Sequence, residues 1–209
     1  MKKQFVSFMA ALFLVISSAG LACALTITNG SFETGDLSGW IPVTSTSSGS
    51  VTVETTTQAS DGTVYNPTDG NYFAKLVADS ALLQMSLDWD AGDVISFSWA
   101  FLAMDYAPYN DFSNFAILTV EPDAFVLTLA DVLGVGDYGD TGWMDYKYTF
   151  KNSGSGNIFF GVNNYADAIL SSVLLVDNVS TTATPEPATL LLLGSGMLGM
   201  AYLKKRKTA

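Results

Sequence analysis

The chain has 209 residues, with 9 Lys plus Arg against 20 Asp plus Glu, and its formal net charge at neutral pH is -11. Nineteen of the acids lie between Glu33 and Asp177, where only three lysines occur, so this stretch carries a net charge of -16. Such a region repels nucleic-acid phosphates and anionic lipid headgroups, which excludes nucleic-acid binding and peripheral membrane binding for it. The chain has no histidine, which excludes Ser-His-Asp triads, imidazole bases and histidine metal sites.

The first 24 residues have the pattern of a secretory signal peptide. Lys2 and Lys3 are followed by an apolar run and then by small residues that end in Ala22-Cys23-Ala24. A basic start, an apolar centre and an A-x-A site predict cleavage after Ala24. The alternative is a lipoprotein acylated at Cys23, for which Gly20 stands where an aliphatic residue is expected. Cleavage after Ala24 leaves a mature chain without thiols, and so without disulfides or thiolate zinc sites.

The last segment, residues 184–209, combines three features in a fixed order. Pro185, Glu186 and Pro187 come first, then an apolar stretch over residues 189–203, then a basic cluster. The cluster consists of Lys204, Lys205, Arg206 and Lys207. About 16 apolar or small residues are marginal for spanning a bilayer, and the basic cluster predicts a stop to transfer with a cytoplasmic C-terminus.

This tail closely resembles the PEP-CTERM sorting signal over residues 185–207. The resemblance implies recognition by an exosortase, a membrane-embedded cysteine protease that removes the tail. It also implies a transient stay in the inner membrane through the apolar helix, and a final place at the surface of a Gram-negative cell or outside it. The alternative is a plain single-pass anchor, which is usually nearer 20 residues long and has no need of a Pro-Glu-Pro motif.

The 159 residues from 25 to 183 are enough for one domain with a sizeable core. Runs that alternate polar with apolar residues, or are rich in aromatic and branched ones, predict nine strands. They cover residues 51–57, 71–77, 81–87, 94–102, 115–120, 125–129, 144–150, 157–162 and 173–180. Gly-, Asp- and Ser-rich turns separate them, including 88–93 and 152–156. We therefore expect an all-β antiparallel sandwich or jelly roll between the signal peptide and the sorting helix.

Sequence patterns at the two ends of this domain fit the same family of folds. Residues 25–40 and 173–180, with 69–74 and 82–84 between them, resemble the galactose-binding-like jelly rolls, a group that holds several carbohydrate-binding module families. In that group a structural calcium often ties the first and last strands. The resemblance implies Glu33 and Asp177 as side-chain ligands, with backbone carbonyls from the loop near Asp69 and Gly70.

Calcium suits the composition because a domain without histidine or cysteine offers hard oxygen ligands, which Ca²⁺ prefers. The alternative is that Glu33 is a solvated acid and Asp177 caps a strand end. A second ion site is conceivable in the loops that hold Asp105, Asp111, Asp137 and Asp140, but we expect these carboxylates to be solvated. Residues 88–93 superficially resemble a calcium loop, yet the EF-hand glutamate is missing there and a hairpin turn is favoured.

Glycan binding requires exposed aromatic rings with amides or carboxylates nearby. Candidates are Tyr106, Tyr109 and Asn110 in one loop, and Tyr138 and Trp143 in another. Aromatic residues of a sandwich otherwise belong to its core, as we expect for Trp40, Phe97, Trp99 and Phe115.

The working interpretation is an exported, non-catalytic surface or matrix protein associated with exopolysaccharide or biofilm. The alternative is a carbohydrate-binding module, and a more distant one is a glycoside hydrolase. A glycosidase needs two carboxylates at a set separation, one of them in an apolar pocket, and no pattern of acids in the sequence indicates such a pair.

Overall fold

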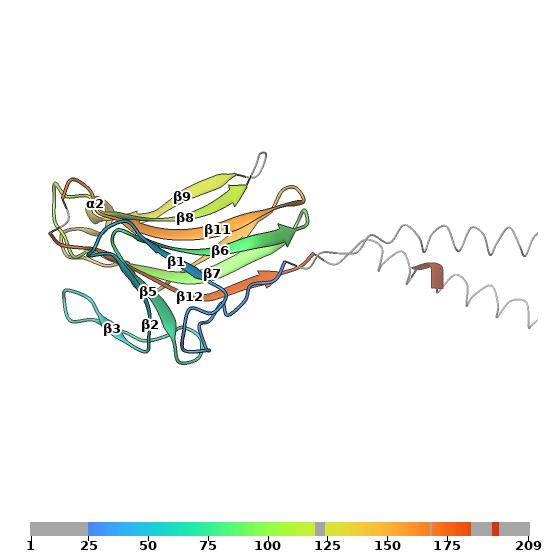
Figure 1. Ribbon diagram of the computed structural model, residues 1–209, viewed down its shortest axis with the longest axis horizontal. Helices are drawn as coiled ribbons and strands as arrows, with labels where there is room; N and C mark the ends of the chain where they lie inside the picture. The colour runs from blue at the N-terminus through green and yellow to red at the C-terminus, as the bar shows by residue number, and fades with distance from the viewer. Residues whose placement is uncertain (1–24, 120–123, 168, 185–193, 197–209) are drawn as a thin grey trace, which may run out of the picture. The chain divides into compact units, whose positions relative to one another are not determined.

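The computed structural model describes residues 25–119, 124–167, 169–184 and 194–196. Residues Ala24–Ala183 form one compact unit. Two five-stranded antiparallel sheets make up this unit, with a small two-stranded sheet beside them (Figure 1). Because this unit contains its own sheets and apolar core, we expect residues 25–183 to fold by themselves.

The first sheet has the strand order β1-β6-β11-β8-β9, and the second has the order β10-β7-β12-β5-β2. In the first sheet the strands are β1 (Ile41–Thr44), β6 (Ser80–Trp89), β11 (Gly154–Asn163), β8 (Phe112–Thr119) and β9 (Phe125–Asp131). In the second they are β10 (Met144–Thr149), β7 (Val94–Leu102), β12 (Val173–Thr182), β5 (Phe73–Val77) and β2 (Ser50–Glu54). The small sheet pairs β3 (Thr57–Gln58) with β4 (Val64–Tyr65).

The all-β prediction is confirmed, and each of the nine predicted strand ranges overlaps an observed strand. Three short strands were not predicted: β1, β3 and β4. Strand β1 contains Pro42 and lies at a sheet edge, where a residue without an N–H is tolerated. The predicted turn over 152–156 is wrong in its second half, because β11 already begins at Gly154 and pairs with Trp89 of β6.

Alternating residues of the strands fill the space between the two sheets. In β12, for example, Leu174 and Val176 belong to the main core, and Val173 and Leu175 belong to a second cluster. The predicted core residues Trp40, Phe97, Trp99 and Phe115 are all buried in the main core.

The second cluster lies on the other side of β12, where Leu175 and Phe73 meet Tyr65 of β4. Trp143 joins them, with its ring centroid 6.0 Å from that of Tyr65 and 5.9 Å from that of Phe73. The outer face of the second sheet is therefore covered.

The two ends of the domain are joined by hydrogen bonds. The backbone N–H of Val179 donates to the carbonyl oxygen of Gly30 at 2.9 Å, and the Thr181 hydroxyl donates to that of Leu25 at 2.7 Å. A Cβ atom at Gly30 would lie 1.8 Å from the Val179 carbonyl oxygen, so only glycine permits this approach. The buried amide of Gln84 holds the same segment through the backbone of Thr28.

Three predictions fall largely outside the described residues: the signal peptide, the Pro-Glu-Pro motif and the apolar helix with its basic cluster. Of the tail beyond Thr184, only Gly194 to Gly196 are described, and they are helical. No helix within the described ranges is long and apolar enough to cross a membrane.

Candidate functional site

Asp177, in β12, ties the last strand to the loop that precedes β5. Its carboxylate accepts hydrogen bonds from the backbone N–H groups of Thr68 at 2.6 Å and Asp69 at 3.0 Å, and from the Thr68 hydroxyl at 2.8 Å. The other carboxylate oxygen accepts from the backbone N–H of Asn178 at 2.6 Å. Burial raises the pKa of Asp177, and these hydrogen bonds act in the opposite direction.

Glu33 holds the same loop from the N-terminal segment. One oxygen accepts from the backbone N–H groups of Asn71 at 2.7 Å and Tyr72 at 3.0 Å, which lowers the pKa of Glu33. Gly70 makes this contact possible, because it has a φ of +66° and a Cβ atom there would lie 2.2 Å from the Glu33 carboxyl carbon. The loop 68–72 is therefore clasped between the first segment and the last strand.

The predicted calcium ligands lie around one loop, but they face hydrogen-bond donors. The loop offers N–H groups to Glu33 and Asp177 where backbone carbonyls toward an ion were predicted. The Asp69 side chain accepts from the Ser31 hydroxyl at 2.7 Å. Across the described part of the chain, no group of three or more acidic side chains is arranged to hold a metal ion. Hydrogen bonds provide a tie here, and calcium stays a prediction.

Three of the predicted glycan-binding residues come together at one end of the sandwich. The ring centroids of Tyr106 and Tyr109 are 5.5 Å apart with nearly perpendicular planes, and those of Tyr106 and Tyr138 are 5.8 Å apart. Tyr106 is 40% exposed and Tyr138 is 42% exposed. We call Tyr106, Tyr109 and Tyr138 the tyrosine platform.

The loops that carry the platform are fastened to each other by backbone contacts. The N–H of Tyr138 donates to the carbonyl oxygen of Asp105 at 3.0 Å, and the N–H of Ala107 donates to the Asp137 carboxylate at 2.9 Å. Burial and the neighbouring Tyr106, Asp105 and Asp137 raise the pKa of Tyr138. A tyrosine phenol is in any case neutral at physiological pH, so Tyr138 keeps a hydroxyl donor.

The other two predicted glycan-binding residues have structural contacts. The side-chain oxygen of Asn110 accepts from the backbone N–H of Leu133 at 2.8 Å, at the start of the short helix α2 (Val132–Val135). Trp143 does not lie with the platform, because it packs in the second cluster and its indole N–H donates to the carbonyl oxygen of Asn66 at 2.9 Å. Replacing Trp143 would therefore disturb packing as well as any binding.

Sequence reasoning missed the residue that organises this end. Asp111 was expected to be solvated, but it is fully buried. Its carboxylate accepts from the backbone N–H of Tyr165 at 2.9 Å and from the N–H and hydroxyl of Ser172 at 3.2 and 2.7 Å. Its carbonyl oxygen accepts from the N–H of Val132 at 3.0 Å. Burial raises the pKa of Asp111, while its hydrogen bonds oppose the shift.

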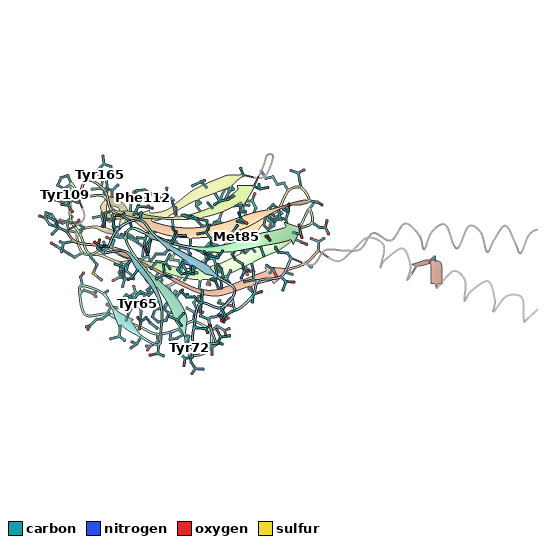
Figure 2. All side chains as sticks on the ribbon, viewed as in Figure 1. Tyr65, Tyr72, Met85, Tyr109, Phe112 and Tyr165 are labelled. Carbon is teal, nitrogen blue, oxygen red and sulfur yellow. The ribbon has the colours of Figure 1, made fainter. Side chains whose placement is uncertain are left out.

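Asp111 thus joins three loops, residues 103–111, 131–143 and 163–172, which we call the loop end. Asp105 was also expected to be solvated, and it too is buried. Its carboxylate accepts from the N–H of Tyr106 at 2.8 Å. The third loop adds a further exposed ring, Tyr165, which lies at the same end as Tyr109 (Figure 2). The only feature of the sequence that could have indicated an exposed ring at Tyr165 is that it lies in a polar loop between two predicted strands.

Gly70→Ala tests the clasp. The substitution places a Cβ atom against Glu33 and forces alanine to a φ of +66°, so we expect the free energy of unfolding to fall by at least about 2 kcal/mol. Gly62→Ala is the matched control, because Gly62 also has a positive φ but its nearest contact would be 3.7 Å away. The control is expected to lose about 1 kcal/mol. If urea unfolding gave the same loss of unfolding free energy for Gly70→Ala and Gly62→Ala, the close contact between Glu33 and residue 70 would be contradicted.

The calcium prediction is tested by thermal unfolding of residues 25–183 in calcium and in EDTA. An ion bound only to the native state at about 100 times its Kd adds about 2.7 kcal/mol, and so raises the midpoint. Glu33→Gln keeps an oxygen for the loop N–H groups but removes the charge, so the calcium effect is expected to disappear in that variant. Identical midpoints of the unchanged chain with and without EDTA would end the calcium prediction.

Comparison with solved structures gives neighbours of low similarity. The carbohydrate-binding module TmCBM61, solved with beta-1,4-galactotriose, is 15% identical over 77% of this chain and 99% of its own, with a TM-score of 0.49. The CBM22-1 xylan-binding domain of Xyn10C from Paenibacillus barcinonensis is 13% identical over 80% and 100%, with a TM-score of 0.43. The Stig cyclase Fisc from Fischerella sp. TAU is 15% identical over 79% and 99%, with a TM-score of 0.49.

No curated protein matches the chain. One family model does match, and it confirms the predicted tail: residues 183–207 correspond to the PEP-CTERM protein-sorting motif. The motif implies export and a sorting signal at the C-terminal end of the chain. The chain therefore carries a PEP-CTERM sorting motif that follows an all-β jelly-roll domain in the sequence.

Proposed function

We propose that this is an exported, non-catalytic protein that binds an extracellular polysaccharide through its tyrosine platform. An exosortase removes the tail at or near Pro185-Glu186-Pro187, after the apolar helix has held the chain transiently in the inner membrane. The basic cluster from Lys204 to Lys207 stops transfer. The domain then associates with exopolysaccharide or biofilm matrix at the surface of a Gram-negative cell or outside it. The sorting motif supports the route, and the platform supports the binding.

The observation that carries the binding proposal is the convergence of three tyrosines from two loops. Aromatic faces pack on the C–H faces of sugar rings, and phenol hydroxyls bond sugar hydroxyls. Tyr106 and Tyr138 have the exposed area for this contact. Their two loops are fixed to each other by hydrogen bonds to the backbone carbonyl oxygens of Asp105 and Asp111 and to the Asp137 carboxylate, so little conformational entropy is lost when a ligand binds.

The negative charge of the loop end indicates which kind of polysaccharide it can bind. The loop end contains Asp137 and Asp167 at or near its surface, and its three loops contain no lysine or arginine. A uronate or sulfated chain would be repelled there, whereas carboxylates accept hydrogen bonds from neutral hydroxyls. We therefore propose a neutral glycan as ligand.

The platform and the end of the last strand lie at opposite ends of the sandwich. Strand β12 begins at the loop end with Val173 and finishes at Thr182, about 30 Å further along the strand.

The hydrogen bonds of the buried acids support the proposal that the protein is non-catalytic. Asp93, Asp105, Asp111 and Asp177 each accept hydrogen bonds from backbone N–H groups of turns and loops. A glycosidase requires one acid kept protonated beside the scissile bond and a second facing it. Release of reducing ends from any member of a broad glycan panel would overturn this part of the proposal.

Retention of residues 25–183 in native gels that contain neutral polysaccharides tests the binding. We expect retardation of the unchanged domain, and at least a tenfold loss of affinity for Tyr138→Ala, since one stacked ring contributes about 1.5 kcal/mol. Tyr138→Phe keeps the ring and is the matched control, with retardation largely preserved. Circular dichroism checks that each variant is folded.

The result also separates two roles. A domain that no glycan in the panel retards, although it is folded, would be a structural matrix protein without a sugar site. A domain that is retarded equally with Tyr138→Ala would bind glycan elsewhere. Either outcome contradicts the platform as the binding site.

A further inference from the structure

The outer face of the first sheet carries a row of apolar side chains across all five strands. Ile41 of β1 is directly opposite Leu83 of β6, and Leu83 is opposite Phe159 of β11. Phe159 is opposite Ala116 of β8, and Ala116 is opposite Val126 of β9. We call these five residues the apolar row.

The apolar row lies on the side of the sheet that faces away from the core. The neighbours of its members along the strands, including Leu82, Phe115, Ile117, Ile158 and Phe160, are core residues. Ile41 is 45% exposed and Val126 is 68% exposed, whereas Leu83 and Phe159 are half-buried and Ala116 is 3% exposed. Met85, two residues beyond Leu83, is 51% exposed and is drawn over the first sheet (Figure 2). None of the five residues of the apolar row belongs to either apolar cluster of the described residues.

The face is also nearly uncharged in a very acidic domain. The five strands of the first sheet contain only two charged residues, Asp88 and Asp131, each in the last two positions of its strand. The rest of residues 25–183 holds the other carboxylates of a region with net charge -16. Two copies of such a domain repel each other in most orientations, and this face is where they can meet with least repulsion.

We propose that two copies of this chain pack face to face through the apolar row. The order of the row supports a second copy as the occupant. A two-fold axis parallel to the strands, between the sheets, places Ile41 against Val126 of the other copy and Leu83 against Ala116. The large Leu83 then faces the small Ala116, and the two Phe159 rings meet at the centre. Such size matching allows the sheets to interdigitate about 10 Å apart.

The Phe159 ring, at the centre of the proposed contact, is held in place by packing within its own sheet. A Cβ atom at Gly161 would lie 2.6 Å from the Phe159 ring, so the ring lies over the glycine and along the sheet surface. The face measures about 24 by 20 Å, or roughly 500 Å² per copy. A standard stable interface buries about 800 Å² per partner. The dimer is therefore weak and forms at the high local concentration of a surface or matrix.

Sedimentation of residues 25–183 from about 5 to about 500 µM tests the proposal, once circular dichroism has shown that they are folded. We expect the mass to rise from monomer toward dimer with concentration. Raising NaCl from about 50 to about 500 mM is expected to strengthen the dimer, because salt screens the repulsion of like charges. Val126→Asp places a charge in the row and is expected to give a monomer throughout. A monomer at every concentration of the unchanged domain would overturn the proposal.

Leu133→Asp is the matched control, since Leu133 is 63% exposed but belongs to α2 at the loop end. It is expected to dimerise like the unchanged domain. Loss of the dimer in Leu133→Asp, with Val126→Asp unaffected, would place the contact at the loop end and contradict the proposal.

Cross-linking tests the direction of the two-fold axis. Residues 25–183 contain no cysteine. In Ile41→Cys with Val126→Cys, a bis-maleimide about 10 Å long is expected to join two copies, because facing sheets lie about 10 Å apart. Within one copy the same residues are about 19 Å apart across four strand spacings, so the reagent cannot bridge them. Each single variant is expected to stay uncrosslinked, and efficient cross-linking of Ile41→Cys alone would contradict the orientation.

Discussion

A single buried carboxylate, that of Asp111, holds together the end of the sandwich on which the proposed function depends. Its oxygens accept from the N–H groups of Tyr165 and Ser172 in one other loop, and the Ser172 hydroxyl, which also donates to it, accepts from the N–H of Met104. The backbone carbonyl oxygen of Asp111 accepts from the N–H of Val132 in the third loop. Burying an aspartate is unfavourable unless such donors surround it. The donors come from segments far apart in sequence, so the loops are fixed only when the whole sandwich is folded. The tyrosine platform is thus a product of the fold and not of its own local sequence.

The two sheets divide the remaining surface between them. The second sheet is closed by Tyr65, Trp143 and their neighbours, which form an apolar cluster on its outer side. The apolar row of the first sheet belongs to neither apolar cluster, and its strands are nearly free of charge. One end of the sandwich and one face are therefore suited to two different contacts. An exported protein that works by binding can use both at once.

Periodicity was sufficient to predict nine of the twelve described strands, because alternation along β7 or β12 reflects which side chains are buried. A family resemblance at the two chain ends implied that a calcium ion ties them, and the structure joins them by hydrogen bonds such as that from Val179 to Gly30. The role of Asp111 could not be predicted, since an acid in a loop is usually solvated and only tertiary contacts show which one is enclosed. The packing of Trp143 could not be predicted for the same reason: its partners, Tyr65 and Phe73, are distant in the sequence.

Asp111→Asn is the most direct test of this account. Asparagine has nearly the same shape, but its amide nitrogen cannot accept a hydrogen bond, so either Tyr165 or Ser172 loses its partner. Retardation of this variant in a neutral polysaccharide gel that retards the unchanged domain is the measurement. We expect the far-ultraviolet circular dichroism to be preserved and the retardation to be lost, with all three platform tyrosines still present. Undiminished retardation would contradict the claim that Asp111 organises the binding end.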